Sequence, residues 1–123
     1  MTIARIIERV DEMKPNAFSE ERKLRWIAEL DGRIALDVML MSITDAESFR
    51  YAFPEDLESE PLVRFPHEAI YEAWLGAMID LANGEYARYQ NSMELFNAQY
   101  GAFVRWFAST YEPAQGYSQE GSR

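Results

Sequence analysis

Seven large apolar side chains recur at alternating spacings of three and four residues toward the C-terminal end of the chain. They are Tyr86, Tyr89, Met93, Phe96, Tyr100, Phe103 and Phe107. This period places all seven on one face of an α-helix. Residues 85–111 contain no proline and one glycine, so the sequence predicts a helix of ~40 Å at 1.5 Å rise per residue. Such a stripe is typical of a packing surface and does not by itself indicate a chemistry.

Two earlier helices are predicted from their caps and apolar periods. Thr2 is a suitable N-cap for a first helix, which Lys14 and the following Pro15 end. Ser19 is a suitable N-cap for a second helix, with acidic residues in its first turn where the helix dipole favours them. Its apolar period continues to Met41, and residues 34–41 are apolar nearly all round, which indicates burial on more than one face.

A third helix is expected to begin at Pro66 and to end at Asn83-Gly84. Its apolar seam consists of Ile70, Trp74, Ala77, Met78 and Leu81. The aromatic stripe alone could be a seam for self-association. Beside this second seam, it is better interpreted as intramolecular packing in an antiparallel helix pair closed by the second helix. Trp106, which lies off the stripe, is then expected to face outward.

Residues 42–65 show no helical period and contain two prolines, which predicts a long irregular loop. Brief alternation at 49–53 and 62–65 allows a short β-hairpin within it. The expected fold is therefore an all-α bundle of about four helices. Residues 1–112 would form a single helical domain, and the polar residues 113–123 would form a flexible tail.

The composition argues against several classes of protein. Apolar residues make up 48% of the chain, which favours a folded domain over a disordered one. The net charge of −9 opposes binding to nucleic-acid phosphates, so no sequence-specific DNA or RNA binding is predicted. There is no cysteine, which excludes disulfides and thiolate metal sites and favours an intracellular origin. No apolar run approaches the ~20 residues that span a bilayer, so a soluble protein is expected.

Residues that could carry chemistry are sparse. His67 is the only histidine, so histidine triads and three-histidine metal sites are excluded, and a helix-starting residue is the simpler interpretation. Glu68 and Glu72 share a helical face, but no Glu-x-x-His accompanies them, and a solvated acidic face explains them better than a metal or acid–base site. No catalytic residue, cofactor or metal ligand is predicted, and the chain is not expected to be an enzyme.

Six residues are candidates for contacts with a partner: Asp37, Phe49, Tyr51, Phe53, Trp106 and Tyr117. Asp37 is the lone charge within residues 34–41, so it either emerges on an exposed strip beside Arg33 or makes a hydrogen-bonded contact to another helix or subunit. The loop aromatics stand among six acids and one arginine in residues 45–60, a local balance of −5. They either bind a partner or fold back onto the core. Tyr117 could anchor the tail on a neighbour.

Two stretches resemble head-tail connector proteins, the head completion or adaptor group of tailed phages and prophages. They read KPNAFSEERKLRWIAELDGRI and LVRFPHEAIYEAWLGAMIDLANGEYARYQNSMELFNAQYGAF. The shared pattern comprises a Pro-Asn turn followed by Trp26, Leu30, Asp31 and Ile34, a helix start at Pro66 to Tyr71, and Asn83-Gly84-Glu85 followed by Tyr89, Asn91 and Phe96.

The resemblance implies a structural virion protein, assembled in the bacterial host cytoplasm. Subunits of this type stack as a ring on the portal and form the platform for the tail, so the expected partners are further copies of the chain and the portal and tail connector proteins. An acidic lumen would repel phosphates and let DNA pass. The alternatives are a small helical regulatory or inhibitor module that binds a host protein, and a metal-dependent enzyme that uses clustered acids.

Overall fold

The computed structural model describes the backbone of residues 1–116 and the side chains of residues 1–110. Within that part the fold is all helical, as predicted, with five α-helices and no strand. The α-helices are α1 (Ile3–Met13), α2 (Glu20–Asp37), α3 (Ile43–Ala46), α4 (Ala69–Ala82) and α5 (Tyr86–Gly116). Two 3-10 turns, η1 (Glu47–Phe49) and η2 (Glu55–Glu58), lie between α3 and α4.

The predicted helix starts are confirmed for α1 and α2. The Thr2 side chain accepts a hydrogen bond from the amide of Arg5, and the Ser19 side chain accepts one from the amide of Arg22. Each cap satisfies an amide that has no partner within its helix. Glu20 lies in the first turn of α2, at the positive end of the dipole.

The end of α2 differs from the prediction, because the helix stops at Asp37 and not at Met41. Leu40 adopts a left-handed backbone conformation with φ of 55°, and the amide of Met41 donates to the carbonyl of Ala35 at 2.9 Å. This closure uses a helix carbonyl that would otherwise lack a partner. The apolar residues after Asp37 therefore belong to a turn, and Leu40 is 80% exposed.

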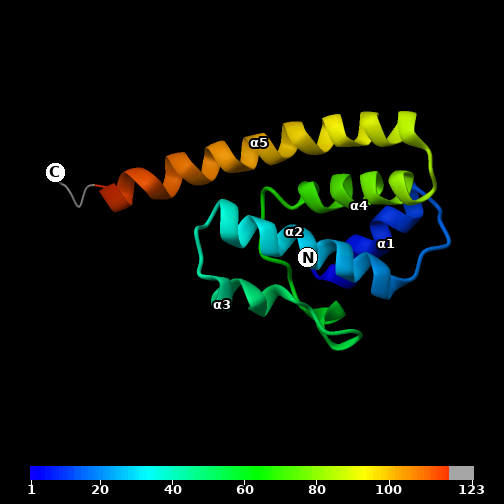
Figure 1. Cartoon of the computed structure of the whole chain (residues 1–123), viewed down its shortest axis with the longest axis horizontal. Helices are drawn as coiled ribbons and strands as arrows, with labels where there is room; N and C mark the ends of the chain where they lie inside the picture. The colour runs from blue at the N-terminus through cyan, green and yellow to red at the C-terminus, as the bar shows by residue number, and fades with distance from the viewer. Residues whose placement is uncertain (117–123) are drawn as a thin grey trace.

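The core forms around α4, which contacts α1, α2 and α5. Figure 1 shows α4 and α5 as an antiparallel pair, with the C-terminal part of α5 continuing past the rest of the bundle. On the aromatic stripe, Phe103 and Phe96 are buried, and the ring of Phe96 lies 5.2 Å from that of Trp74. The indole N–H of Trp74 donates to the carbonyl of Trp26 at 2.9 Å, which joins α4 to α2. The aromatic stripe is thus an intramolecular seam.

The loop between α3 and α4 contains no β-hairpin, in contrast to what the alternation at 49–53 and 62–65 allowed. Several of its amides donate to side chains, and those of Asp56, Leu57 and Ser59 donate to carbonyls within the loop. The amide of Leu62 donates to Asp31 at 3.0 Å, and the amide of Val63 donates to the Tyr71 hydroxyl at 2.7 Å. The amide of Ala52 donates to Asp56 at 2.7 Å. With these donors occupied, the strands of a hairpin could not pair fully.

The other boundaries also shift by a few residues. Residues 64–68 form turns ahead of α4, which starts at Ala69 and not at Pro66. The α5 helix runs to Gly116, so the expected boundary at residue 112 falls inside a helix. Residues 117–123 of the expected tail lie outside the described residues.

Candidate functional site

Asp31, on the inner face of α2, is a fully buried acid at 0% exposure. One carboxylate oxygen accepts hydrogen bonds from the Tyr51 hydroxyl at 2.6 Å and from the amide of Leu62 at 3.0 Å. The other accepts a hydrogen bond from the Tyr71 hydroxyl at 2.5 Å. Three donors compensate for the loss of water around this charge, as a buried carboxylate requires.

The Asp31 network connects segments that are far apart in the sequence. Tyr71 lies on α4 and also accepts a hydrogen bond from the amide of Val63, so it contacts both α2 and the end of the loop. Tyr51 lies near the start of the same loop, between η1 and η2. The carboxylate of Asp31 thereby holds the loop against α2 at two places.

Burial sets the protonation of this network. Desolvation raises the pKa of Asp31 above its ordinary value, and the hydrogen bonds from Tyr51, Tyr71 and Leu62 partly oppose that rise. Burial and the nearby Asp31 charge also raise the pKa of Tyr51 and of Tyr71. Both phenols therefore keep their protons and remain hydrogen-bond donors to Asp31.

A pH dependence follows from the raised pKa of Asp31. A folded-state pKa above the unfolded value of about 3.9 means that the folded protein binds the proton more tightly. The stability from this group is fully present below the unfolded pKa and is lost as the pH rises through the folded pKa. We expect wild type to gain stability relative to Asp31→Asn as the pH is lowered from about 8 to about 4. Urea denaturation of both proteins at each pH measures the difference between their free energies of unfolding. The expectation would be contradicted if this difference did not change with pH, or if wild type lost stability relative to Asp31→Asn as the pH was lowered.

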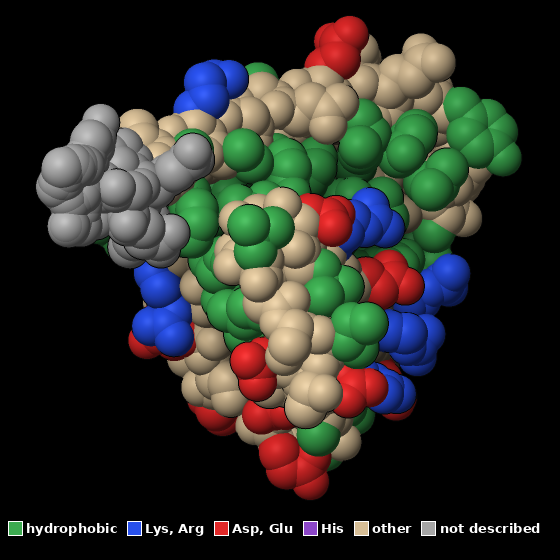
Figure 2. All heavy atoms as spheres, turned by 60° about the vertical axis from the view of Figure 1, so that its left-hand side comes forward, with side chains coloured by type: hydrophobic (Ala, Val, Ile, Leu, Met, Phe, Trp, Pro, Cys, Tyr) green, Lys and Arg blue, Asp and Glu red, His purple; other side chains and the backbone are tan. Residues whose placement is uncertain are grey.

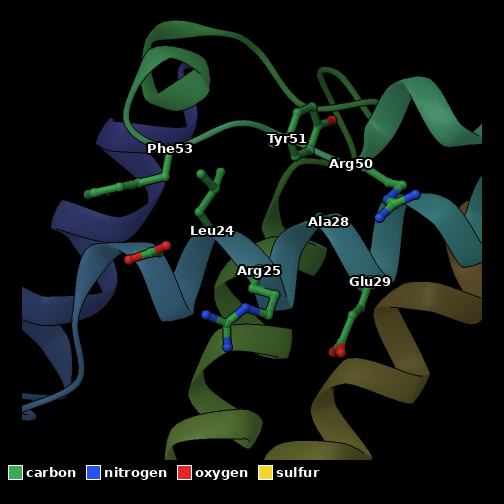
Figure 3. A pocket seen from close by; sticks show the side chains of 8 residues that line it. Leu24, Arg25, Ala28, Glu29, Arg50, Tyr51 and Phe53 are labelled. Carbon is green, nitrogen blue, oxygen red and sulfur yellow. The ribbon is translucent and has the colours of Figure 1, made fainter.

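Beside this network, α2 and the loop form the two sides of a groove that is open to solvent (Figure 3). A section of about 350 Å³ lies between Leu24, Arg25 and Ala28 of α2 and Arg50, Tyr51 and Phe53 of the loop. A second section of about 440 Å³ shares Ala28, Glu29 and Arg50 with the first and continues to Leu36 and Ile43. We call the two sections together the α2–α3 groove.

The α2–α3 groove has an apolar floor and charged rims. Its floor follows one row of α2 residues spaced by four, namely Leu24, Ala28, Gly32 and Leu36. The next row of α2 alternates in charge and forms one rim, namely Glu21, Arg25, Glu29 and Arg33. The opposite wall comes from α3, η1 and the loop, where Ile43 is 72% exposed and Phe53 is 41% exposed. An apolar floor between charged rims is the composition of a docking surface for another protein.

The six residues predicted for partner contacts lie in different places. Tyr51 and Phe53 line the groove, and the Tyr51 hydroxyl also binds Asp31. Phe49 is half-buried, with its ring 6.4 Å from that of Tyr51. Trp106, on α5, is 38% exposed, and its ring lies 4.8 Å from that of His67. Tyr117 lies outside the described residues.

Asp37 is exposed at the last position of α2. Its charge contributes, after burial, to the raised pKa of Tyr100 on α5. Within the described chain Asp37 lies on the exposed strip of α2, and its contact with another subunit stays a prediction. The buried acid of α2 is Asp31, which was named only within the pattern shared with connector proteins and not as a candidate site residue. Its position between Ile27 and Ala35, four residues from each on the apolar face, is the signal that could have identified it.

Two further buried charges were also missed. Lys23 is 2% exposed, and its ammonium group lies 2.7 Å from Asp11 of α1. Asp80 is 1% exposed and accepts hydrogen bonds from Lys14 and from Ser92, both at 2.7 Å. Lys23 and Asp11 join α2 to α1, and Asp80 joins α4 to α5 and to Lys14, the residue that follows α1. Each is partnered, as buried charges generally are, so they are best explained as structural contacts.

Among the described residues, no group of three or more histidine, cysteine, aspartate or glutamate side chains is arranged to hold a metal ion. The same part of the chain contains no helix with the length and hydropathy of a membrane span. No known family model, curated protein or solved structure matches this chain.

Proposed function

We propose that this chain is a structural assembly protein, a head-tail connector or adaptor subunit that docks on a phage portal and forms the platform for the tail. The observation that carries the proposal is the α2–α3 groove. Its apolar floor is open to solvent, and its loop wall is fixed by the buried carboxylate of Asp31. A rigid, preformed docking surface suits a protein that acts by binding neighbours, because little conformational freedom is lost on assembly.

The distribution of charge supports a place beside packaged DNA. On the face shown in Figure 2, hydrophobic side chains form a band below α5, and acidic side chains gather toward the lower end. Figure 1 places the loop that follows α3 at that end. Acidic residues on a ring's inner surface would repel DNA phosphates and keep the genome free to slide. The proposed location is the virion, after assembly in the bacterial host cytoplasm.

Direct binding to the portal tests this function. We expect the purified chain to co-elute in size-exclusion chromatography with its cognate phage portal protein. Replacing Phe53 with serine should weaken co-elution, because its exposed ring lies in the groove. Leu95→Ser serves as the matched control, since Leu95 is 54% exposed on α5 and does not line the groove. Failure of wild type to bind the portal, together with specific capture of a purified host protein, would favour the regulatory alternative instead.

A further inference from the structure

A second hollow of the surface lies between α1 and α5, which both pack on α4. It measures about 270 Å³ and shares no lining residue with the α2–α3 groove. Its floor is a row of small α4 residues, and its walls carry apolar side chains of α1 and α5. The floor consists of Ala69, Ala73 and Gly76, and the walls include Val10, Met13 and Leu95. We call this space the α1–α5 cleft.

Two buried oxygen atoms at this cleft lack a hydrogen-bond donor among the described residues. One is Oε1 of Gln99, whose side chain lines the cleft. The other is Oδ1 of Asp80, a residue that is 1% exposed. Lys14 and Ser92, which both line the cleft, donate to the other carboxylate oxygen of Asp80, each at 2.7 Å. Because a buried acceptor without a donor is unfavourable, the cleft favours an occupant that donates a hydrogen bond.

The charges around the cleft are already paired, which favours a neutral occupant. The ammonium group of Lys14 lies 2.7 Å from Asp80, and the carboxylate of Glu72 lies 2.9 Å from Arg9. A cation would be repelled by the ammonium group, and an anion would be repelled by the two carboxylates. A neutral hydroxyl or N–H group avoids both repulsions and still supplies the donor.

The walls and the volume of the cleft indicate the rest of the occupant. Met13 is 70% exposed on the α1 side, and Leu95 is 54% exposed on the α5 side. An apolar ring between them would remove apolar surface from water, and the methionine sulfur makes favourable contacts with aromatic rings. The volume of about 270 Å³ lies just below the ~300–1,000 Å³ of sites for drug-sized ligands, so it suits a single substituted ring.

We propose that the α1–α5 cleft binds a small neutral molecule that consists of one ring and a hydroxyl or N–H donor, of which a phenol is the simplest case. The ring lies between Met13 and Leu95, and the donor reaches Oε1 of Gln99. Such a ligand contacts α1, α4 and α5 together, so it stabilises the folded chain. The site goes beyond the proposed function, because it uses a part of the surface that portal docking leaves free.

Two isomeric probes, p-cresol and anisole, test the site. Both have one ring and one oxygen, but only the hydroxyl of p-cresol can donate a hydrogen bond. Each probe is titrated into the ¹⁵N-labelled full chain and followed by NMR. We expect p-cresol to saturate with a Kd on the order of 1 mM, as for a ligand of about eight non-hydrogen atoms, with its shifts concentrated at Ser92, Leu95 and Gln99. Anisole should bind about tenfold more weakly, because it leaves the Gln99 oxygen without a donor.

Gln99→Leu removes the acceptor and keeps a side chain of similar size. In this variant p-cresol and anisole should bind with equal affinity. Gln90→Leu is the matched control, because Gln90 is exposed on the same helix and does not line the cleft. It should keep the tenfold preference for p-cresol. A preference that survived in Gln99→Leu would contradict the assigned hydrogen bond.

Three results with the wild-type chain alone would overturn the proposal. Shifts that do not saturate, or that spread over the whole surface, would indicate nonspecific partitioning of the probes. Shifts centred on Leu24 and Phe53 would place p-cresol in the α2–α3 groove instead. Equal affinity for p-cresol and anisole would show that solvent satisfies Gln99. The docking proposed for the α2–α3 groove would stand in the first and third cases, since the two sites share no lining residue.

Discussion

Replacing Asp31 with alanine is expected to lower the free energy of unfolding by about 3–5 kcal/mol. The substitution removes the acceptor for the half-buried Tyr51 hydroxyl, the buried Tyr71 hydroxyl and the amide of Leu62. Each donor left without a partner in the interior costs about 1–3 kcal/mol, with partial relief as the loop relaxes toward water. Urea denaturation followed by circular dichroism at neutral pH measures the loss.

Asp37→Ala is the matched control for this prediction, because Asp37 is an exposed acid on the same helix. Its effect should stay within about 0.5 kcal/mol, as for most surface substitutions. A similar loss for both variants would show that the carboxylate of Asp31 has no special role. The Asp31 variant should also lose portal binding, because the loop wall that carries Tyr51 would no longer be fixed.

Replacing Phe103 with alanine is expected to lower the free energy of unfolding by about 3–5 kcal/mol as well. Its ring is 1% exposed and contacts His67 and Phe107, so truncation leaves a cavity where α5 packs on the bundle. The loss includes the transfer of the ring from water and the dispersion contacts that the cavity removes. Thermal and urea denaturation should both report it.

Tyr86→Ala is the matched control from the same aromatic stripe. Tyr86 is 65% exposed at the first position of α5, and its truncation should cost less than about 0.5 kcal/mol. If Phe103→Ala and Tyr86→Ala had equal effects, the stripe would not be the intramolecular seam that the structure describes. Repeating the measurement at several protein concentrations distinguishes packing within one chain from packing between two chains. If the stripe packed between two chains, the effect of Phe103→Ala would depend on protein concentration.

The sequence was most informative where short-range chemistry determines structure. Thr2 and Ser19 identified helix starts because an N-cap needs only its own first turn, and the stripe through Phe96 and Phe103 identified a seam because its period is local. The predicted end of α2 was wrong by four residues, because the helix ends at Asp37 and not at Met41. There, Leu40 takes a left-handed conformation that its residue type does not favour.

The site was less predictable because it depends on contacts between distant segments. Tyr51 and Phe53 were identified as loop aromatics, but their roles depend on Asp31 and on the floor of α2. Asp37 was a candidate contact residue because it is the lone charge in an apolar run. The buried acid of the same helix is Asp31, six residues earlier. Sequence alone did not show that two phenol hydroxyls and an amide from other segments would donate hydrogen bonds to Asp31. These bonds offset the cost of burying its carboxylate.

Mass measurement tests the proposed docking of this chain on portal rings. Mass photometry of portal rings mixed with excess protein should show one discrete heavier species, shifted by a whole-number multiple of the chain's mass. That result would show several copies docking at defined positions on the portal. A portal mass that stays unchanged at saturating protein concentration would contradict the proposed docking.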